Sequence, residues 1–512
     1  MPAPLPADFG VAIDPATRVE GEGAVLLGGD PFAVVRLGED HAAAVRAWRR
    51  GEPAGREPQR GRLARALVAT NLAQPVPPAR DPGLAVTAVV PVRDRPEQLQ
   101  RLLTALAGTA EVAEVVVVDD ASHDPGRTAR VAGRAGARLL RRTSRGGAAA
   151  ARNDGAAAAG TPVVAFVDSD CVPRPGWLRS TLPHLADPHV AVVAPRIVAR
   201  QEGAGLGGPG GPGGPGEALT APGGSGGAFA APPVNRSSPL ADYERCRSPM
   251  DRGPAPASVR PGGRVPFLPG AALVARASAL GAGFDTTLTG GEDVDLVWRL
   301  VRDGWHVRYE PAGSVEHEHR TRPGPWLARR AYYGRTAAPL ERRHPGAARP
   351  LAISPWTAAA WAAAALGRPL SAGGITATAV ALLARELGGV VPDPVGTAVA
   401  LAGGGTVRSG WVVADAVTRS WWPLSLLAAA LLPRLRLPLA AAALLPPALD
   451  WRKLRPPVDP LAWTALRLLD DLAYGWGVWS GCLRGRQAGP LLPDLGWRLS
   501  ILSGEELTDR YG

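Results

Sequence analysis

Acidic side chains follow three short apolar runs of the sequence, directly after the point where each run ends. These are Val86–Val90 before Pro91 and Asp94, Val115–Val118 before Asp119-Asp120, and Val163–Val167 before Asp168-Ser169-Asp170. Because ligands bind where the carboxyl ends of parallel strands meet, we expect these groups to converge on one edge of a sheet. Crowded carboxylates need a cation, and hard oxygen ligands select Mg²⁺ or Mn²⁺. The pattern predicts a divalent-cation site for a diphosphate, although a lone Asp168 or Asp170 equally suits a turn or cap.

A further group of carboxylates opens a predicted helix. Gly290-Gly291 is followed by Glu292, Asp293 and Asp295, and then by the amphipathic stretch Leu296–Arg302. A carboxylate in the first turn is stabilised as the anion by the helix dipole, which suits a general base. We expect Asp293 to be that base, because Asp295 should point to a different side of the helix. Glu292 would lie at the cap with a longer, less fixed side chain, and a simple capping role is the alternative for the whole group.

Two histidines and a basic, aromatic stretch lie further along the chain. His317 and His319 alternate in an extended segment, so they face the same side and either ligate a metal ion or are solvated. The residues that follow either grip phosphates or form a solvated face. They are Arg329, Arg330, Tyr332, Tyr333 and Arg335.

The elements that must position these residues alternate between strand and helix. The three apolar runs, with the weaker run Ala191–Ala194, are typical of strands buried on both faces of a parallel sheet. Between the first two runs, leucines recur with the spacing of an amphipathic helix, at Leu99, Leu102, Leu103 and Leu106. This alternation predicts a Rossmann-like, doubly wound α/β domain over residues 84–345.

Regions of different amino-acid composition flank this domain. Residues 1–81 predict a small α+β module with a hairpin over Ala24–Leu37, helices at Ala42–Trp48 and Leu63–Leu72, and a stiff linker over Pro75–Pro78. Gly203–Pro233 consists almost entirely of Gly, Pro and Ala, which predicts a flexible insertion. Residues 350–512 predict an Ala-rich, hydrophobic and mostly helical tail.

The tail leaves two interpretations open. Its apolar stretches include Leu351–Gly367, Trp421–Pro433 and Leu437–Leu449, and none clearly reaches the roughly 20 residues that span a bilayer. They are either buried helices or interfacial helices anchored by Arg and Trp, which would attach the protein to the inner face of the plasma membrane.

Charge and cysteine content bound the partners and the compartment. The formal net charge of +11 suits anionic partners, but no basic run is interleaved with aromatic residues, so we expect no nucleic acid partner. The three cysteines suggest neither a disulfide framework nor a zinc site. Since the first ten residues also lack the features of a secretory signal, we expect a cytoplasmic protein.

Seven stretches, in this order, resemble family-2 glycosyltransferases of the GT-A fold. They are Val89–Val92 with Asp94, Val118–Ser122, Ala151–Gly155, Phe166–Asp170, Pro269–Ala271, Glu292-Asp293 and His317. The resemblance implies a UDP-sugar donor bound by Pro91, Asp94, Asp119, Arg152 and Asp168. It implies that Asp170 and His317 bind the metal ion and that Asp293 is the base of an inverting transfer. Gly270, Glu292, His319 and Arg335 are further candidates for contacts to the acceptor or the diphosphate.

The order of the three regions is similar to that of the mycofactocin-system glycosyltransferases of actinobacteria. Leu5–Phe9, Pro269–Leu273 and Tyr332–Arg335 carry this narrower resemblance. It implies transfer of glucose to a peptide-derived redox cofactor precursor, which the N-terminal module would help to recognise. The alternatives are a membrane-surface glycosyltransferase with a lipid or polysaccharide acceptor, and an inactive scaffold, which the intact set of acids disfavours.

Overall fold

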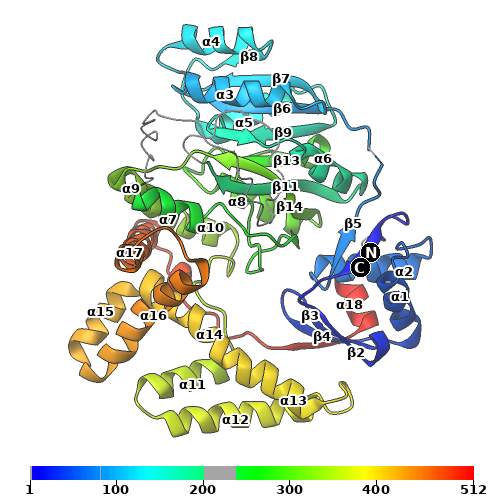
Figure 1. Ribbon diagram of the computed structural model, residues 1–512, viewed down its shortest axis with the longest axis vertical. Coiled ribbons are helices and arrows are strands. Elements are labelled where there is room, and N and C mark those ends of the chain that lie inside the picture. Colours follow the sequence, from blue (N-terminus) through cyan, green and yellow to red (C-terminus); the bar gives the residue numbers. More distant parts are fainter. Residues whose placement is uncertain (1–2, 81, 201–237) are drawn as a thin grey trace, which may run out of the picture.

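The computed structural model describes residues 3–80, 82–200 and 238–512 (Figure 1). The predicted insertion Gly203–Pro233 lies outside these described residues. Within them, a large mixed sheet occupies the centre of the chain, and a small N-terminal module and a group of C-terminal helices lie beside it.

The large sheet has nine strands, in the order β10-β14-β11-β13-β9-β6-β7-β8, with β12 paired to β14. Its bounds are β6 Val86–Val92, β7 Val112–Asp119, β8 Arg138–Arg141, β9 Val163–Val167, β10 Cys171–Pro173, β11 Val190–Ala199, β12 Ala257–Ser258, β13 Ala272–Arg276 and β14 His306–His317. Strands β6, β7, β8 and β9 are parallel, as the apolar runs predict. The whole sheet is mixed, because β13 lies antiparallel between β9 and β11.

Helices cover both faces of this sheet. They are α3 Pro96–Ala107, α4 Pro125–Arg134, α5 Gly147–Ala158 and α6 Trp177–Thr181. The four leucines predicted to face the core are buried in α3, which confirms the stripe. In α5, Gly155 lies so close to β6 that an added Cβ would overlap the Val89 side chain. These contacts fix the strand ends where the candidate residues lie.

The later helices of the central region complete the surroundings of those strand ends. They are α7 Pro239–Arg247, α8 Glu292–Arg302, α9 Pro323–Arg335 and α10 Ala337–Arg343. Helix α8 buries Leu296, Val297 and Leu300 against the sheet, as its amphipathic pattern predicts. Its first turn, with Glu292 and Asp293, remains at the edge of the core.

The N-terminal module contains the predicted hairpin, formed by β3 Val25–Gly28 and β4 Ala33–Arg36. Its other elements are β1 Gly10–Ile13, β2 Arg18–Glu20, α1 Glu39–Arg49, α2 Pro58–Ala69 and β5 Ala73–Val76. The prediction of a linker beginning at Pro75 is wrong, because Pro75 and Val76 pair with β1 as part of β5. A proline is tolerated there because β5 pairs on one side only.

The end of the chain returns to this module. Strand β15, Ser500–Ser503, adds to β4 in parallel, and α18, Gly504–Tyr511, packs on α2. Leu502 and Leu507 are buried in the core of the module. The predicted helical tail over residues 350–512 therefore ends before Ser500, and the last residues belong structurally to the N-terminal module.

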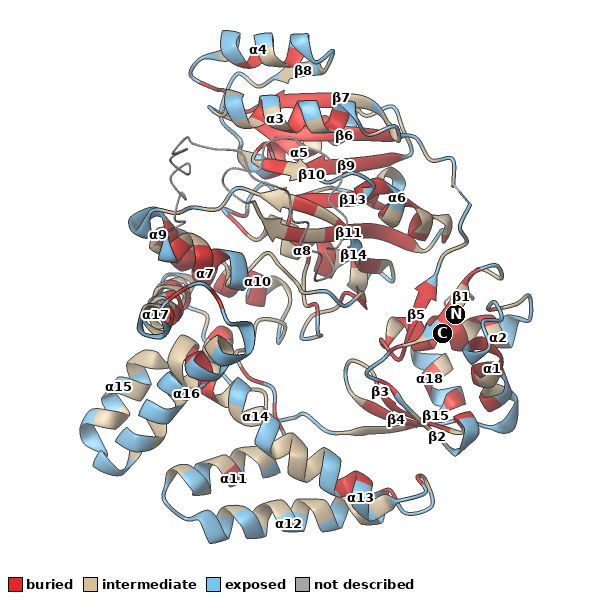
Figure 2. Ribbon diagram, viewed as in Figure 1, coloured by how far each residue is buried: buried red, intermediate tan, exposed pale blue. Residues whose placement is uncertain are grey.

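The C-terminal helices begin after α10. They are α11 Pro355–Ala365, α12 Pro369–Glu386, α13 Pro394–Ala398, α14 Gly404–Asp415, α15 Trp422–Leu431, α16 Arg436–Leu454 and α17 Pro460–Gly485. Helix α17 crosses α9 so closely that a Cβ on Gly334 would overlap the Tyr474 carbonyl. By contrast, α12 and α15 contain no buried residue (Figure 2). Of the helices described, none combines the length and the apolar character needed to cross a membrane.

Candidate functional site

A cavity of about 830 Å³ opens at the carboxyl ends of β6 and β9. Most of the residues singled out in the sequence line it. They are Pro91, Arg152, Asp168, Asp170, Gly270, Glu292, Asp293 and His317. The sheet brings them together because β6 and β9 are adjacent and parallel, so Pro91 and the Asp168–Asp170 segment emerge on the same edge. The convergence predicted for these residues is therefore present in the structure.

Arg152 lies at the centre of the charged residues of the cavity. Its Nη2 donates to Asp168 Oδ1 at 2.7 Å, and its Nη1 donates to Glu292 Oε1 at 2.9 Å. Burial alone would lower the pKa of Arg152, but Asp168 and Glu292 raise it above its ordinary value. Arg152 is therefore a permanent buried cation that joins α5, the end of β9 and the start of α8.

Asp293 is held in a fixed orientation by two backbone groups. The N–H of Gly270 donates to its Oδ2 at 2.7 Å, and the N–H of Val294 donates to its Oδ1 at 2.8 Å. Burial, with the neighbouring charge of Glu292, raises the pKa of Asp293 to about 6. The helix dipole therefore does not dominate here, contrary to the argument from sequence. The carboxylate nevertheless remains mostly ionised at neutral pH, with a proton affinity suited to a general base.

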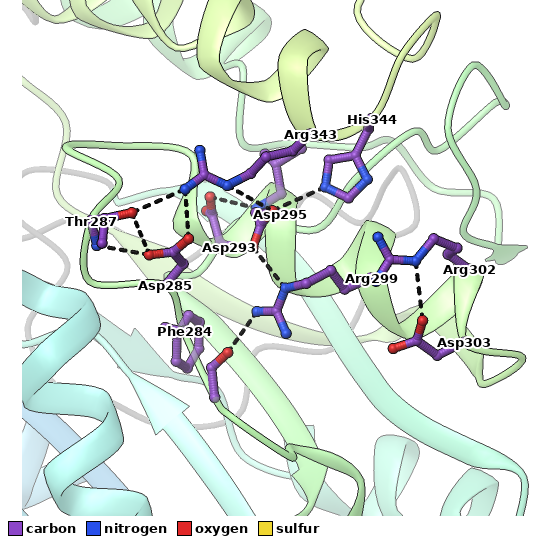
Figure 3. A network of polar contacts seen from close by, with 12 residues as sticks. Phe284, Asp285, Thr287, Asp293, Asp295, Arg299, Arg302, Asp303, Arg343 and His344 are labelled. Atoms are coloured by element: carbon purple, nitrogen blue, oxygen red, sulfur yellow. Dashed lines mark hydrogen bonds and ion pairs between the residues drawn. The ribbon is translucent and has the colours of Figure 1, made fainter.

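Asp295 faces away from the cavity, as the helical spacing predicts. Its carboxylate accepts from Arg299 Nε at 2.8 Å and contacts His344 Nε2 at 3.0 Å (Figure 3). Before α8 begins, Gly290 is required by a close contact, because a Cβ there would overlap the hydroxyl of Tyr332. The ring of Tyr332 therefore lies against the segment that leads into Asp293.

Asp170 and His317 face each other across the pairing of β10 with β14. The Nε2 of His317 lies 3.7 Å from Asp170 Oδ1, and Arg95 forms an ion pair with the same carboxylate. Burial alone would raise the pKa of Asp170, but His317 and Arg95 hold it below its usual range. Across the described residues, no group of three or more His, Cys, Asp or Glu side chains is arranged to hold a metal ion. This part of the chain thus offers a carboxylate and an imidazole, and other ligands would have to come from the substrate.

His319 contacts His317, with 3.1 Å between their Nδ1 atoms, which agrees with the prediction that both lie on one face. It does not line the main cavity but a smaller adjoining one of about 160 Å³. Burial and the charge of His317 lower the pKa of His319 to about 3, so this imidazole is neutral.

Three other predicted residues do not line the main cavity. Asp119 is fully buried below it, where its Oδ1 accepts from the N–H of Ser122 at 2.9 Å. Its Oδ2 has no hydrogen-bond partner within the described part of the chain. Asp94 is exposed and accepts from the N–H of His123 at 2.7 Å. Arg335 is exposed at the end of α9 and does not line the main cavity.

Sequence reasoning missed several residues of the cavity wall. Arg95, Phe267, Arg419 and Tyr474 all line it. Arg95 follows directly after Asp94, so its proximity to the strand end is a signal that could have been used. Arg419 and Tyr474 lie in the C-terminal helices, and only the packing of α17 on α9 brings them to the cavity.

Comparison with known proteins defines the class. Residues 87–218 match the model of the family described as "Glycosyl transferase family 2". Solved structures that resemble the chain include a mannosyltransferase from Pyrobaculum calidifontis in complex with GDP-Man and Mn²⁺. It is 20% identical, with a TM-score of 0.36, over 52% of this chain and 66% of that one. A structure of GalNAc-T7 with UDP, GalNAc and Mn²⁺ is 16% identical, with a TM-score of 0.32, over 50% of this chain and 48% of that one. The family match places a family-2 glycosyltransferase domain on the first strands of the large sheet.

Curated relatives define the class further. Proteins named "Pre-mycofactocin glycosyltransferase", from two strains of Mycobacterium tuberculosis, are 38% identical to this chain over 507 residues. The alignment covers 96% of this chain and 98% of each relative. The chain therefore belongs to the pre-mycofactocin glycosyltransferase family.

The Arg152 contacts generate a prediction about stability. We expect Arg152→Met to lower the free energy of unfolding by roughly 3–5 kcal/mol, because it leaves two partly buried carboxylates without their cation. Urea denaturation measures this change. Arg127→Met is the matched control, since Arg127 forms an exposed pair with Glu97 that should contribute at most about 1 kcal/mol. Equal effects of the two substitutions would contradict the assigned role of Arg152.

Proposed function

We propose that this chain transfers glucose from UDP-glucose to a peptide-derived precursor of a redox cofactor, with inversion at the anomeric carbon. The single observation that carries the proposal is the position of Asp293, held by Gly270 beside Arg152 and Asp168 in one cavity. The acceptor class is supported by the name of the relatives that align along nearly the full chain.

The donor would bind at the strand ends. Pro91 and Asp168 line that part of the cavity, and Arg152 supplies a fixed positive charge there. Asp119 pairs with Val92, which lines this cavity, and its Oδ2, which is buried and has no hydrogen-bond partner among the described residues, would accept an N–H from the nucleotide base. We assign Asp94 no direct contact, because it is turned toward His123 outside the cavity.

The residues at Asp170 fit a divalent cation. Asp170 and His317 would hold Mg²⁺ or Mn²⁺, and the diphosphate and water would complete its coordination. When bound, the cation neutralises the charge that develops on the departing diphosphate. In the described structure Arg95 pairs with Asp170, so this arginine would have to release the carboxylate as the cation binds.

The chain's own chemistry is then a single proton transfer. Asp293 accepts the proton of the acceptor hydroxyl while that oxygen forms its bond to the anomeric carbon. The bond from this carbon to the diphosphate oxygen breaks on the opposite side, with the electron pair leaving on the nucleotide. Glu292 contributes indirectly, because its charge helps to raise the pKa of Asp293.

The N-terminal module remains a candidate for acceptor recognition. The carboxylate of Asp30, in the turn between β3 and β4, accepts from the backbone N–H of Arg264. The preceding Gly262 and Gly263, with the following Pro266, line the cavity. A molecule bound to the module would therefore lie one loop away from the site, and the recruitment of a peptide-derived acceptor by residues 1–81 stays a prediction.

Asp293→Asn should separate chemistry from donor binding. We expect kcat to fall by roughly 10²–10⁴, because the amide cannot accept the proton, while the Kd for UDP-glucose stays within about twofold. Product formation by mass spectrometry and donor binding by calorimetry measure the two quantities. Asp303→Asn, an exposed substitution just after α8, is the control. Near-normal turnover of Asp293→Asn, with an inactive Glu292→Gln, would move the base to Glu292.

The raised pKa of Asp293 predicts how activity depends on pH, and Glu292→Gln tests that dependence. The base must be ionised, so the kcat/KM of the wild type should fall tenfold per pH unit below about 6, where Asp293 of the free protein becomes protonated. Glu292→Gln removes a negative neighbour that raises the pKa of Asp293, so the loss of activity on the acidic side of the profile, its acidic limb, should move to lower pH. An acidic limb that moves to higher pH, or does not move, would contradict the coupling.

We further propose that the C-terminal helices attach the protein to an anionic membrane surface. Helix α15, Trp422–Leu431, carries no charged side chain and no buried residue, although a helix that is apolar all round normally requires burial. Leu431 and Leu437 are 68% and 80% exposed. Between them, Arg434 and Arg436 are exposed, and neither pairs with a carboxylate within the described residues. Apolar side chains beside unpaired arginines suit a bilayer with anionic headgroups.

Vesicle flotation tests this attachment. At low salt we expect the wild type to float with vesicles that contain anionic lipid and to remain below neutral ones. Leu431→Glu with Leu437→Glu should abolish flotation, because both leucines would lose their apolar contact. Val76→Glu is the control, since Val76 is an exposed apolar residue of the N-terminal module. A wild type that does not float with anionic vesicles would contradict the proposal.

A further inference from the structure

The C-terminal helices supply part of the cavity that contains Asp293. Arg419, in the π-helical turn Ala416–Ser420, and Tyr474, in α17, line the same cavity as the strand ends. Turns of π-helix inside longer helices are frequent at functional sites. A region that sequence alone presents as an appended tail therefore forms a wall of the site.

A chain of close contacts connects the parts of the site. The backbone N–H of Gly270 donates to Asp293. A Cβ added to Gly291, two residues before Asp293, would lie 3.1–3.5 Å from side-chain atoms of Thr336 and Leu340. Helix α9, which ends just before Thr336, meets α17 through the contact of Gly334 with Tyr474. These contacts link α8, α9, α10 and α17, and one cavity is lined by Asp293, by residues of the strand ends and by Tyr474.

The wall residues are fixed in place. The guanidinium carbon of Arg419 lies 3.9 Å from the centroid of the Tyr474 ring, and its Nη1 donates to Asp471 Oδ1 at 2.7 Å. Gly475 permits this approach, because a Cβ there would overlap the carbonyl of Arg419. A second buried pair, Arg330 with Asp470 at 3.0 Å, holds α17 to α9. The ring and the guanidinium are therefore preorganised, which lowers the entropy cost of binding.

The two ends of the cavity differ in chemistry. Its lining carboxylates, Asp120, Asp168, Asp170, Glu292 and Asp293, all lie at the strand ends or at the start of α8. Three of the six tyrosines of the chain line it, and all three belong to α9 and α17. Carboxylates suit the metal and diphosphate chemistry of a donor, whereas rigid aromatic side chains suit a ring-bearing ligand.

We propose that Tyr474 and Arg419 form the acceptor-binding wall of the site, for an acceptor that carries a sugar or aromatic ring beside its reacting hydroxyl. This proposal rests on the proposed function. Since Asp293 and Tyr474 line the same cavity, an acceptor bound against Tyr474 has its hydroxyl in the cavity that contains the base. The C-terminal helices then determine which acceptor is used and leave donor binding to the strand ends.

Steady-state kinetics of this protein with UDP-glucose and the peptide-derived precursor tests whether the wall binds the acceptor. Tyr474→Leu should raise the acceptor KM at least tenfold, and Tyr474→Phe should restore it to within about threefold, because the ring is retained. The Kd for UDP and the rate of UDP-glucose hydrolysis should not change. Trp476→Leu is the matched control on α17, since Trp476 is exposed and does not line the cavity.

A second variant keeps the test valid if Tyr474→Leu does not fold. Ala348→Phe adds volume to the cavity beside the cluster that contains Tyr474, and it should raise the acceptor KM while UDP binding is unchanged. An unchanged acceptor KM in the folded variants, or an equal loss of UDP affinity, would overturn the proposal. A wild type that hydrolyses UDP-glucose but transfers nothing to the precursor would instead contradict the proposed function.

Discussion

The guanidinium of Arg152 is buried between the carboxylates of Asp168 and Glu292, and the geometry of the site depends on this contact. It joins a helix that covers the sheet, the end of a central strand, and the first turn of the helix that carries Asp293. A buried arginine without partners would be very costly, so the three elements must meet at this point for the chain to fold. The positive charge of Arg152 lowers the pKa of Asp293 and so opposes the negative charge of Glu292, which raises it. Folding and the placement of the candidate base are therefore linked through one residue.

The regions on either side of the central sheet are tied to it in different ways. The N-terminal module is held by buried polar contacts, such as Arg65 with Asp187 and Asn71 with the backbone of Ser258. Its core is completed by Leu502 and Leu507 from the end of the chain. The C-terminal helices, by contrast, meet the catalytic region mainly where α17 crosses α9 through glycines. The helices α12 and α15 contain no fully buried residue, although Val380, Leu383 and Ala384 of α12 are partly buried against the N-terminal module.

How far the sequence predicts this arrangement depends on whether a feature is local. Strands β6, β7 and β9 are buried for much of their length, so they appear as unbroken apolar runs, and Asp120, Asp168 and Asp170 after them line one cavity. The stripe of α3 and the opposite directions of Asp293 and Asp295 follow from helical spacing alone. Asp94 and Arg335 do not line the cavity, because a motif fixes the position of a residue along the chain but the local backbone fixes where its side chain points. The antiparallel β13, the pairing of β15 with β4 and the positions of Arg419 and Tyr474 depend on contacts between distant segments, which no local pattern encodes.

We propose that the acids of this cavity carry out a cation-assisted, inverting transfer of glucose. The most direct measurement is the reaction of the wild-type protein with UDP-glucose and the peptide-derived precursor, with and without excess chelator. Product is detected by mass spectrometry, and its anomeric configuration is assigned by NMR. We expect a β-linked glucoside that forms with Mg²⁺ or Mn²⁺. It should not form in excess chelator, because the departing diphosphate lacks its counter-charge when the cation is removed. An α-linked product, or full activity in excess chelator, would contradict it.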